Sequence, residues 1–260
     1  MNAAHTPGIT GRSRFPGAIP RYNGRMTDGL RERYDSDAGA RAYARKYDGR
    51  WSRRLSSRRE MNLVRWAMTT GREAGGGGGG GPPSPTGTVL DVPCAAGRLV
   101  PVLLEHADRV TAVDRSPAMV AVAREATAGE AAAGRVVVGE GDAMALAFAD
   151  GAFDTVVCWR LLHHLTERGD RVRVLRELAR TSRRGVVVTF ADAGTWKARF
   201  QRWRRRNRRC AKLTTHGLAS EARDAGLSLL ATRRLSSLFS LLAAAVLLPD
   251  SYPGVNRPGP

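Results

Sequence analysis

The chain of 260 residues has few cysteines and no long apolar run, and both shortages exclude classes of protein. Its three cysteines, Cys94, Cys158 and Cys210, lie far apart and form no Cys-x-x-Cys pair. An odd number of separated cysteines argues against a disulfide framework, so we expect a cytoplasmic protein, and we predict no metal site. The longest apolar run, residues 238–248, is shorter than the ~20 residues that a membrane-spanning helix needs. We therefore expect no transmembrane segment, and the N-terminal residues lack the apolar stretch of a signal peptide.

Acidic residues are also scarce: 24 Asp and Glu stand against 42 Lys and Arg, which gives a formal net charge of +18. Such a balance is typical of proteins that bind a polyanion such as RNA, or an anionic membrane surface. It is equally expected of an arginine-rich proteome with solvated basic side chains, since the arginines are spread widely along the chain. A hydrophobic content of 42% is sufficient for a core. Composition alone leaves both interpretations of the charge open.

Changes in composition divide the chain into five segments. We predict a disordered leader over 1–27, an N-terminal helical cap over 28–72, a Gly/Pro linker over 73–87, a sheet domain over 88–250 and a disordered tail over 251–260. The cap is expected to contain two helices, near 36–47 and 53–70. Its aromatic residues either cover a ligand site or simply pack on the domain.

From residue 88 onward, apolar strand patterns alternate with helical patterns, which indicates an α/β fold with a mostly parallel sheet. Strands are expected at 88–92, 109–113, 135–138, 153–159, 185–190 and 227–232. Helices are expected at 98–107, 117–132, 170–182 and 215–225. The apolar run at 238–248 fits either a last strand or a helix, because Ala and Leu dominate it.

The stretch over residues 88–98 reads T-V-L-D-V-P-C-A-A-G-R. An apolar strand leads to the acidic Asp91 and then to a turn of small residues that ends at Gly97. A buried strand that turns through small residues into a helix is the first βα unit of a nucleotide-binding domain. The small side chains let the backbone approach a ligand closely.

Three further stretches follow in the order that such a domain requires. Asp114 ends the second strand roughly 20 residues after the first turn, the spacing at which a carboxylate reaches ribose hydroxyls. Ser116 and Pro117 then suit the N-cap and the first position of the next helix. Asp142 follows the third strand, and the sequence C-W-R-L-L-H-H-L (158–165) ends the fourth.

Together, the four stretches resemble the class I S-adenosylmethionine (SAM) dependent methyltransferases, and in particular the methyltransferase type 11-like domains. The resemblance implies an α/β fold: a Rossmann-like, doubly wound, mostly parallel seven-stranded sheet with an N-terminal helical extension. It also implies SAM as the cofactor. The family usually has three glycines in the first turn, where this chain has Pro93, Ala95 and Gly97. The first two either shift the loop slightly or lower the affinity for SAM.

The resemblance also implies roles for individual residues. By it, Asp91 positions the loop and the SAM amino group, Asp114 holds the ribose, and Asp142 accepts a hydrogen bond from the adenine amino group. The other residues expected around SAM are Pro93, Cys94, Ala95, Gly97, Arg115, Met119, Ala143, Cys158 and Trp159. His163 and His164 are candidate general bases, although either equally suits local packing or capping. Asp154 is expected to tether the start of its strand.

We therefore predict a SAM-dependent methyltransferase that acts on a small-molecule or lipid-like acceptor. Two alternatives stay open: an RNA methyltransferase that uses its basic surface, and a non-catalytic binding protein with a SAM fold. The segment 196–212 mixes arginines with aromatic residues, which suits nucleic acid and also an anionic lipid surface. An Asn-Pro-Pro-Tyr-like tetrad, which many methyltransferases of nucleobase nitrogens carry, is missing after the fourth strand, and this disfavours RNA.

Overall fold

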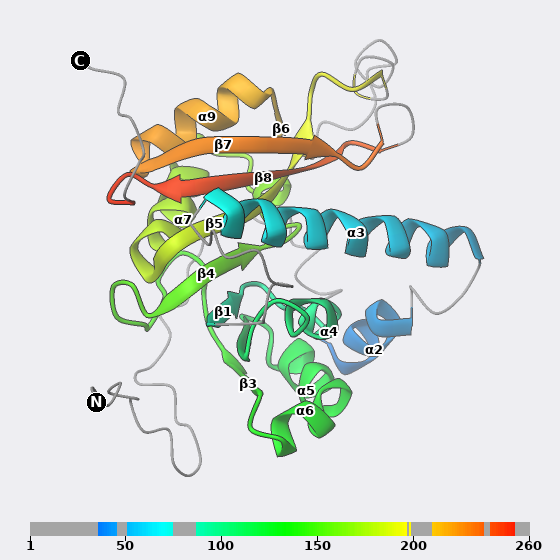
Figure 1. Cartoon of the computed structure of the whole chain (residues 1–260). Coiled ribbons are helices and arrows are strands. Elements are labelled where there is room, and N and C mark those ends of the chain that lie inside the picture. Colours follow the sequence, from blue (N-terminus) through cyan, green and yellow to red (C-terminus); the bar gives the residue numbers. More distant parts are fainter. Residues whose placement is uncertain are drawn as a thin grey trace, which may run out of the picture.

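A twisted, mostly parallel β-sheet lies at the centre of the molecule in the computed structural model (Figure 1). The structure describes residues 36–45, 51–74, 87–196, 198, 210–236 and 240–252. The leader predicted over 1–27 lies outside these residues, as do most of the predicted linker and tail. The domain boundaries therefore stay predictions.

Seven strands pair side by side in the order β3-β2-β1-β4-β5-β8-β7. They are β1 (Thr88–Asp91), β2 (Arg109–Asp114), β3 (Val136–Glu140), β4 (Phe153–Cys158), β5 (Ser182–Asp192), β7 (Leu227–Arg234) and β8 (Leu242–Pro249). The first five run parallel, whereas β8 is antiparallel to both β5 and β7. This topology confirms the predicted Rossmann-like sheet. A further strand, β6 (Lys212–Leu213), pairs with β5 and is too short to show a pattern in the sequence.

Helices form most of the connections between the strands. They are α2 (Asp37–Arg45), α3 (Trp51–Ala74), α4 (Val100–Leu103), α5 (Pro117–Ala126), α6 (Ala128–Ala132), the 3-10 helix η1 (Leu162–His164), α7 (Arg168–Thr181) and α9 (Thr215–Asp224). Ser116 caps α5 as predicted, since its hydroxyl accepts a hydrogen bond from the Met119 N–H.

Two of the predicted helices differ from the structure. The helix expected at 117–132 divides at Thr127, whose hydroxyl donates to the Ala123 carbonyl while its backbone leaves helical geometry. The helix expected at 98–107 is helical only in α4. After α4, the N–H groups of Glu105 and His106 donate to carbonyls three residues back, so the segment continues as tight turns.

The apolar run that fitted either a strand or a helix forms β8. All eight residues of β8 are buried, because β5 and β7 flank the strand and helices cover both faces of the sheet. Ala and Leu favour helices when isolated, so pairing with neighbouring strands overrides the local preference here.

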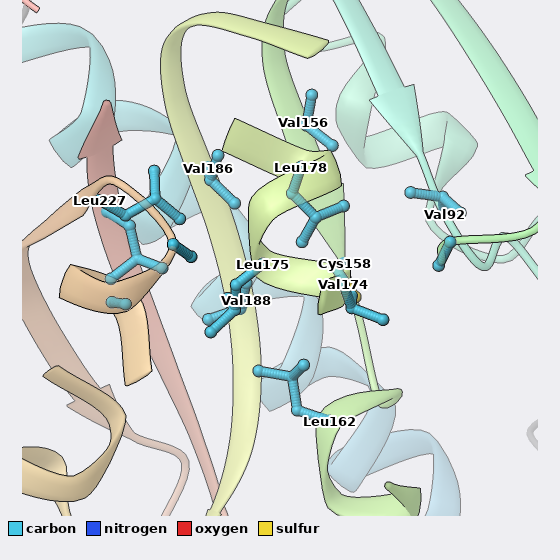
Figure 2. Close-up of a cluster of buried hydrophobic side chains, with 14 of the residues drawn as sticks. Val92, Val156, Cys158, Leu162, Val174, Leu175, Leu178, Val186, Val188 and Leu227 are labelled. Atoms are coloured by element: carbon cyan, nitrogen blue, oxygen red, sulfur yellow. The ribbon is translucent and has the colours of Figure 1, made fainter. Parts of the chain in front are cut away.

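The sheet has helices on both faces, which gives three layers (Figure 1). On one face, α7 and η1 pack on β4 and β5; Figure 2 shows Leu162, Val174, Leu175 and Leu178 lying against Val156, Cys158, Val186 and Val188. On the other face, α3 packs on β5 and β8, α4 packs on β2, and α5 packs on β2 and β3. Because side chains alternate along a strand, neighbouring residues belong to opposite layers.

The long helix α3 belongs to the second of these layers. It lies across β5 and β8 and buries Leu63, Val64, Ala67 and Met68 against them. The shorter α2 packs on α5 and on the loop after β1, through Ala40 and Tyr43. Among the residues that the structure describes, no helix is long and apolar enough to cross a membrane.

Candidate active site

The parallel strands bring three acidic residues to one edge of the sheet. Asp91 is the last residue of β1 and pairs in register with Ala112 of β2 and Val157 of β4. Asp114 ends β2, and Asp142 follows two residues after the end of β3. In open α/β sheets, ligands bind beyond these carboxyl ends. The structure thus gathers the three carboxylates that the sequence singled out.

The loop after β1 wraps around the carboxylate of Asp114. The N–H of Ala95 donates to Asp114 Oδ2 at 2.8 Å, and the N–H of Ser116 donates to Oδ1 at 2.9 Å. Ala95 has a φ of +47°, in the left-handed region where glycine is favoured. The partly buried Pro93 precedes Cys94, whose N–H reaches the Val113 carbonyl at 2.8 Å. The loop therefore closes on β2 with Pro93 and Ala95 in place of the usual glycines.

Gly97 ends this loop at a position that a larger residue would not tolerate. Its φ is +74°, and a Cβ atom there would lie 3.3 Å from Thr127 Cγ2 and 3.4 Å from Ala123 Cα. Both contacts are on the end of α5 or next to it. The glycine therefore lets α5 pack closely against the loop.

Asp91 is fully buried, and neither of its carboxylate oxygens has a hydrogen-bond partner among the described residues. Burial and, to a smaller extent, the nearby charge of Asp114 together raise the pKa of Asp91 to about 8, against the opposing charge of Arg98. A buried carboxylate without donors costs stability unless a ligand supplies them. The site is thus built to accept hydrogen bonds or a cation.

Asp142 is half satisfied in the same way. Its Oδ1 accepts from the Met144 N–H at 2.9 Å, while its buried Oδ2 has no partner among the described residues. The next residue, Ala143, packs into the core beside Val92 and Val113. A donor that arrives from a ligand can therefore reach one Asp142 oxygen without disturbing the other.

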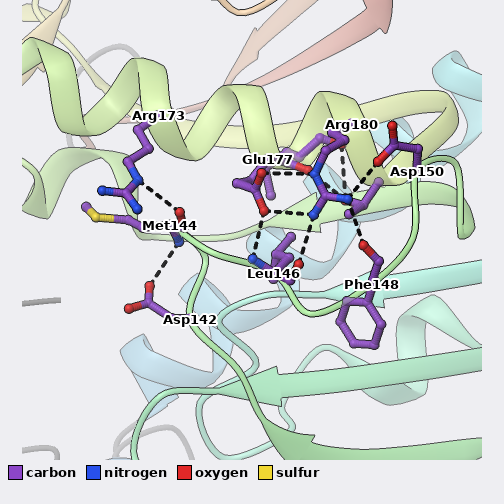
Figure 3. A network of polar contacts seen from close by, with 10 residues as sticks. Asp142, Met144, Leu146, Phe148, Asp150, Arg173, Glu177 and Arg180 are labelled. Atoms are coloured by element: carbon purple, nitrogen blue, oxygen red, sulfur yellow. Dashed lines mark hydrogen bonds and ion pairs between the residues drawn. The ribbon is translucent and has the colours of Figure 1, made fainter. Parts of the chain in front are cut away.

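Arginines of α7 hold the loop that carries Asp142 (Figure 3). Arg180 donates to the carbonyls of Leu146 and Phe148 and pairs with Asp150 and with Glu177. The Leu146 N–H donates in turn to Glu177 at 2.8 Å. Arg173 secures the Met144 carbonyl at 3.0 Å. These contacts fix the loop over residues 142–150.

Several of the other predicted residues are buried in packing. Met119 is 2% exposed and lies between α2 and α5 with Ala40, Ala96 and Ala118. Cys94 and Cys158 are also buried, and burial raises the pKa of both thiols. Arg115 is partly exposed next to Asp114. The two thiols and Met119 are thus engaged in packing.

His163 and His164 follow β4, in η1. Their ring centroids are 4.1 Å apart, and the buried Nδ1 of His163 has no partner among the described residues. Burial, followed by the neighbouring His164 and Arg160, lowers the pKa of His163 to about 3. Burial and Arg160 also lower the pKa of His164. Both imidazoles are therefore neutral at physiological pH.

The carbonyl of His163 accepts from the Ala211 N–H at 3.0 Å, just before β6. This bond ties the end of the basic aromatic segment to η1. Residues 197 and 199–209 of that segment lie outside the described residues. Its described start, Trp196, is 65% exposed.

Sequence reasoning missed the buried Glu60 of α3. Its carboxylate accepts from the Trp159 indole N–H at 2.9 Å and from Arg160 Nε at 2.6 Å, and it pairs with Arg98 at 3.0 Å. Trp159, predicted to border SAM, therefore turns its indole toward α3. The signal that could have found Glu60 is slight: an acidic residue within an arginine-rich helix, beside apolar positions.

Asp154 accepts a hydrogen bond from the Thr88 N–H at 2.8 Å, as its predicted tethering role requires.

The unsatisfied acceptors fit SAM. The cofactor carries an ammonium group, two ribose hydroxyls and an adenine amino group, all of which donate hydrogen bonds. Among the described residues, three buried oxygens of Asp91 and Asp142 have no hydrogen-bond donor. A cationic ligand also matches a site with three carboxylates.

Comparison with known proteins agrees with this chemistry. Residues 89–185 match a family described as "Methyltransferase domain". A magnesium protoporphyrin IX methyltransferase (ChlM) from Synechocystis PCC 6803, with bound S-adenosylhomocysteine (SAH), has a TM-score of 0.68 at 20% identity and covers 85% of this chain and 98% of its own. The match extends ahead of residue 87, since residues 87–260 make up only about two thirds of the chain. The N-terminal segment thus belongs to the shared architecture.

Two further structures share the fold. A putative methyltransferase in complex with the Haloferax volcanii Trm112 methyltransferase activator has a TM-score of 0.58 at 17% identity, over 82% of this chain and 97% of its own. A possible histamine N-methyltransferase from Thermotoga maritima has a TM-score of 0.53 at 16% identity, over 82% of this chain and 96% of its own. Residues 89–185 therefore match the methyltransferase domain family, and the chain shares the fold of solved methyltransferases over most of its length.

Proposed function

We propose that this enzyme transfers the methyl group of SAM to a small-molecule or lipid-like acceptor, beside the loop that carries His163 and His164. The observation that carries the proposal is the set of buried Asp91 and Asp142 oxygens that have no donor among the described residues, at the sheet edge where β4 leads into η1 and His163. In this proposal, the acids accept hydrogen bonds from SAM, and the loop that carries His163 and His164 contacts the methyl acceptor.

In this proposal, each acid holds one part of SAM. Asp91 pairs with the ammonium group, Asp114 accepts from the ribose hydroxyls and Asp142 accepts from the adenine amino group. When bound, SAM supplies an electrophilic methyl group on a positively charged sulfur. The backbone of residues 93–97 and of 158–159 borders the cofactor, with Arg115 and Met119 on the adenine side.

The chain contributes mainly by orientation, because methyl transfer is an in-line displacement. The neutral imidazole of His163, whose Nδ1 is buried, can accept a hydrogen bond from an acceptor hydroxyl or amine and align its lone pair. Its low pKa makes it a weak proton acceptor at neutral pH, so the proposal does not require a strong general base. His164 contacts His163 and takes the same neutral form.

A half-buried, neutral histidine favours a small or apolar acceptor that excludes water over a polymer held at the surface. A magnesium protoporphyrin IX methyltransferase shares the fold, which is consistent with a small-molecule acceptor. The three free cysteines support a cytoplasmic setting, where thiols stay reduced.

RNA is the second candidate acceptor, because the segment 196–212 combines basic and aromatic residues. Most of that segment lies outside the described residues, so the motif alone supports this candidate. A non-catalytic binding protein is the third candidate. The three retained acids speak against it, since an unsatisfied Asp91 only costs stability in a fold without a ligand.

The experiment is a product screen with SAM labelled on its methyl group. Wild-type protein is incubated with small-molecule, lipid and RNA extracts, and the Asp114→Ala variant provides the background. We expect label in the small-molecule or lipid fraction with wild type only. Label in RNA, with binding that weakens steeply as salt rises, would favour the second candidate. SAM binding without transfer to any fraction would favour the third.

A further inference from the structure

Glu60 is a buried acid that methyl transfer itself does not use. It lies on α3, its side chain is 0% exposed, and α3 is fixed on the sheet by Leu63 and Val64. A charged carboxylate at such a position is tolerated only when it is paired and hydrogen-bonded. Its partners therefore show what holds it there.

The partners of Glu60 come from two separate loops. Oε1 accepts from the Trp159 indole at 2.9 Å and from Arg160 Nε at 2.6 Å, both just after β4. Oε2 lies 3.0 Å from a guanidinium nitrogen of Arg98, the residue after Gly97. Burial alone would raise the pKa of Glu60, but Arg160 and Arg98 hold it below its usual range. The Glu60 carboxylate is thus ionised and pairs with arginines of two loops.

Each loop serves a different side of the site. Arg98 directly follows the loop that wraps Asp114, and its charge also opposes the pKa shift of Asp91. Arg160 lies three residues before His163, in left-handed backbone with a φ of +62°. The N–H of Arg160 donates to Thr189 Oγ1 at 2.6 Å, which anchors the turn on β5.

We propose that Glu60 is a positioning residue that links the cofactor loop to the acceptor loop through this shared carboxylate. This inference rests on the SAM site proposed above: Glu60 sets the separation between the methyl donor and the loop that carries His163. One carboxylate neutralises half of the charge of two guanidinium groups. Without it, Arg98 and Arg160 repel each other across a poorly solvated gap, and both loops lose a common anchor.

The test compares Glu60→Gln with Glu105→Gln in the full chain. Glutamine keeps the size of the side chain and removes its charge. Glu105 also pairs with α3, through Arg65 at 2.6 and 2.7 Å, but this pair is at the surface and far less buried. Calorimetry with SAH measures Kd, and hydrogen–deuterium exchange follows peptides over 94–99 and 159–164.

We expect Glu60→Gln to raise the Kd for SAH at least about tenfold, which corresponds to about 1.4 kcal/mol. Exchange is expected to accelerate in both loops and to stay unchanged in β3 and α9. Glu105→Gln is expected to change neither quantity. Unchanged affinity and unchanged exchange at 159–164 in Glu60→Gln would overturn the proposal, as would an equal acceleration throughout the sheet.

A second variant, Arg98→Gln, keeps the test decisive if Glu60→Gln does not fold. Arg98 is at the end of the loop after β1, and Glu60 connects it to Arg160 in the loop after β4. The proposal predicts faster exchange at 159–164 in Arg98→Gln, and an effect confined to 94–99 would overturn it. If wild-type protein does not bind SAH, the proposed function fails, while exchange in the free protein still tests the link between the loops.

Discussion

At the scale of single residues, the acids at the sheet edge are arranged for a ligand at the expense of the free protein. Asp91 has no donor within the described residues, and burial holds its pKa near 8. Its neighbour Asp114 already accepts two backbone N–H groups, which order the loop after β1 before any ligand arrives. Asp114 therefore orders the loop, whereas Asp91 is available to a ligand that donates hydrogen bonds.

The first prediction concerns the stability of the free protein. The folded pKa of Asp91 is above its unfolded value of 3.8, so the native state binds more protons between about pH 4 and pH 8. Stability should fall as pH rises through this window. Asp91→Asn does not titrate, so we expect it to be more stable than wild type by about 1–3 kcal/mol at pH 8 and by less at pH 5. Urea denaturation at both pH values checks this, and a pH-independent difference would contradict it.

A second prediction follows for the cofactor. The cationic SAM favours the ionised form of Asp91, so binding below pH 8 should release a proton. The affinity for SAM is expected to rise from pH 6 to pH 8, by up to about tenfold per pH unit. Calorimetry in two buffers with different ionisation enthalpies measures the proton directly. An affinity that does not depend on pH in wild type, or that keeps its slope in Asp91→Asn, would refute this.

At the scale of elements, α7 acts as a frame for the loop that presents Asp142 (Figure 3). Four groups of that loop, two carbonyls, one N–H and one carboxylate, are held by Arg180 and Glu177. The loop has no regular structure of its own over most of its length, so these contacts replace the backbone ladder that a strand would provide.

We therefore predict that Arg180→Ala weakens both the loop and the cofactor site. The loss of its hydrogen bonds is expected to lower the free energy of unfolding by about 2–4 kcal/mol and to lower SAM affinity through Asp142. Arg176→Ala on the same helix removes one exposed hydrogen bond, to the Asp224 carbonyl, and serves as the control. Equal effects of the two variants on SAM affinity would argue against the framing role.

Helices α7 and α9 provide a second matched pair. The buried Arg171 binds Glu221 through two hydrogen bonds of 2.9 and 2.6 Å, whereas Arg168 and Asp224 pair at the surface. We expect Glu221→Gln to cost about 3–5 kcal/mol of unfolding free energy, and Asp224→Asn about 0–1 kcal/mol. Urea denaturation of both variants tests this, and similar costs would show that burial does not set the strength of these pairs.

The sequence predicts most strands and helices, because period-two and period-3.6 patterns are local. It leaves β8 undecided, since only pairing with β5 and β7 makes an Ala- and Leu-rich run a strand. Asp91, Asp114 and Asp142 are visible in the sequence because they end strands at fixed spacing. Glu60 is not, because its partners, Arg98 and Arg160, are brought to it only by the packing of α3.

At the scale of the whole molecule, the N-terminal helices are a structural layer of the enzyme. Helix α3 lies across β5 and β8, and α2 lies on α5 and on the loop after β1 (Figure 1). The N-terminal helices therefore contact both the sheet and the loop after β1. The end of the basic segment 196–212 contacts η1, because the Ala211 N–H donates to the His163 carbonyl.

The account depends most directly on SAM binding at the three acids. Calorimetry with SAM on wild type, Asp114→Ala and the surface control Glu105→Gln tests it. We expect wild type and Glu105→Gln to bind with the same affinity, and Asp114→Ala to bind at least about tenfold more weakly, because two charge-assisted hydrogen bonds to the ribose and the order of the loop are lost. Wild-type protein that does not bind SAM, or an Asp114→Ala variant that binds as wild type does, would contradict the account.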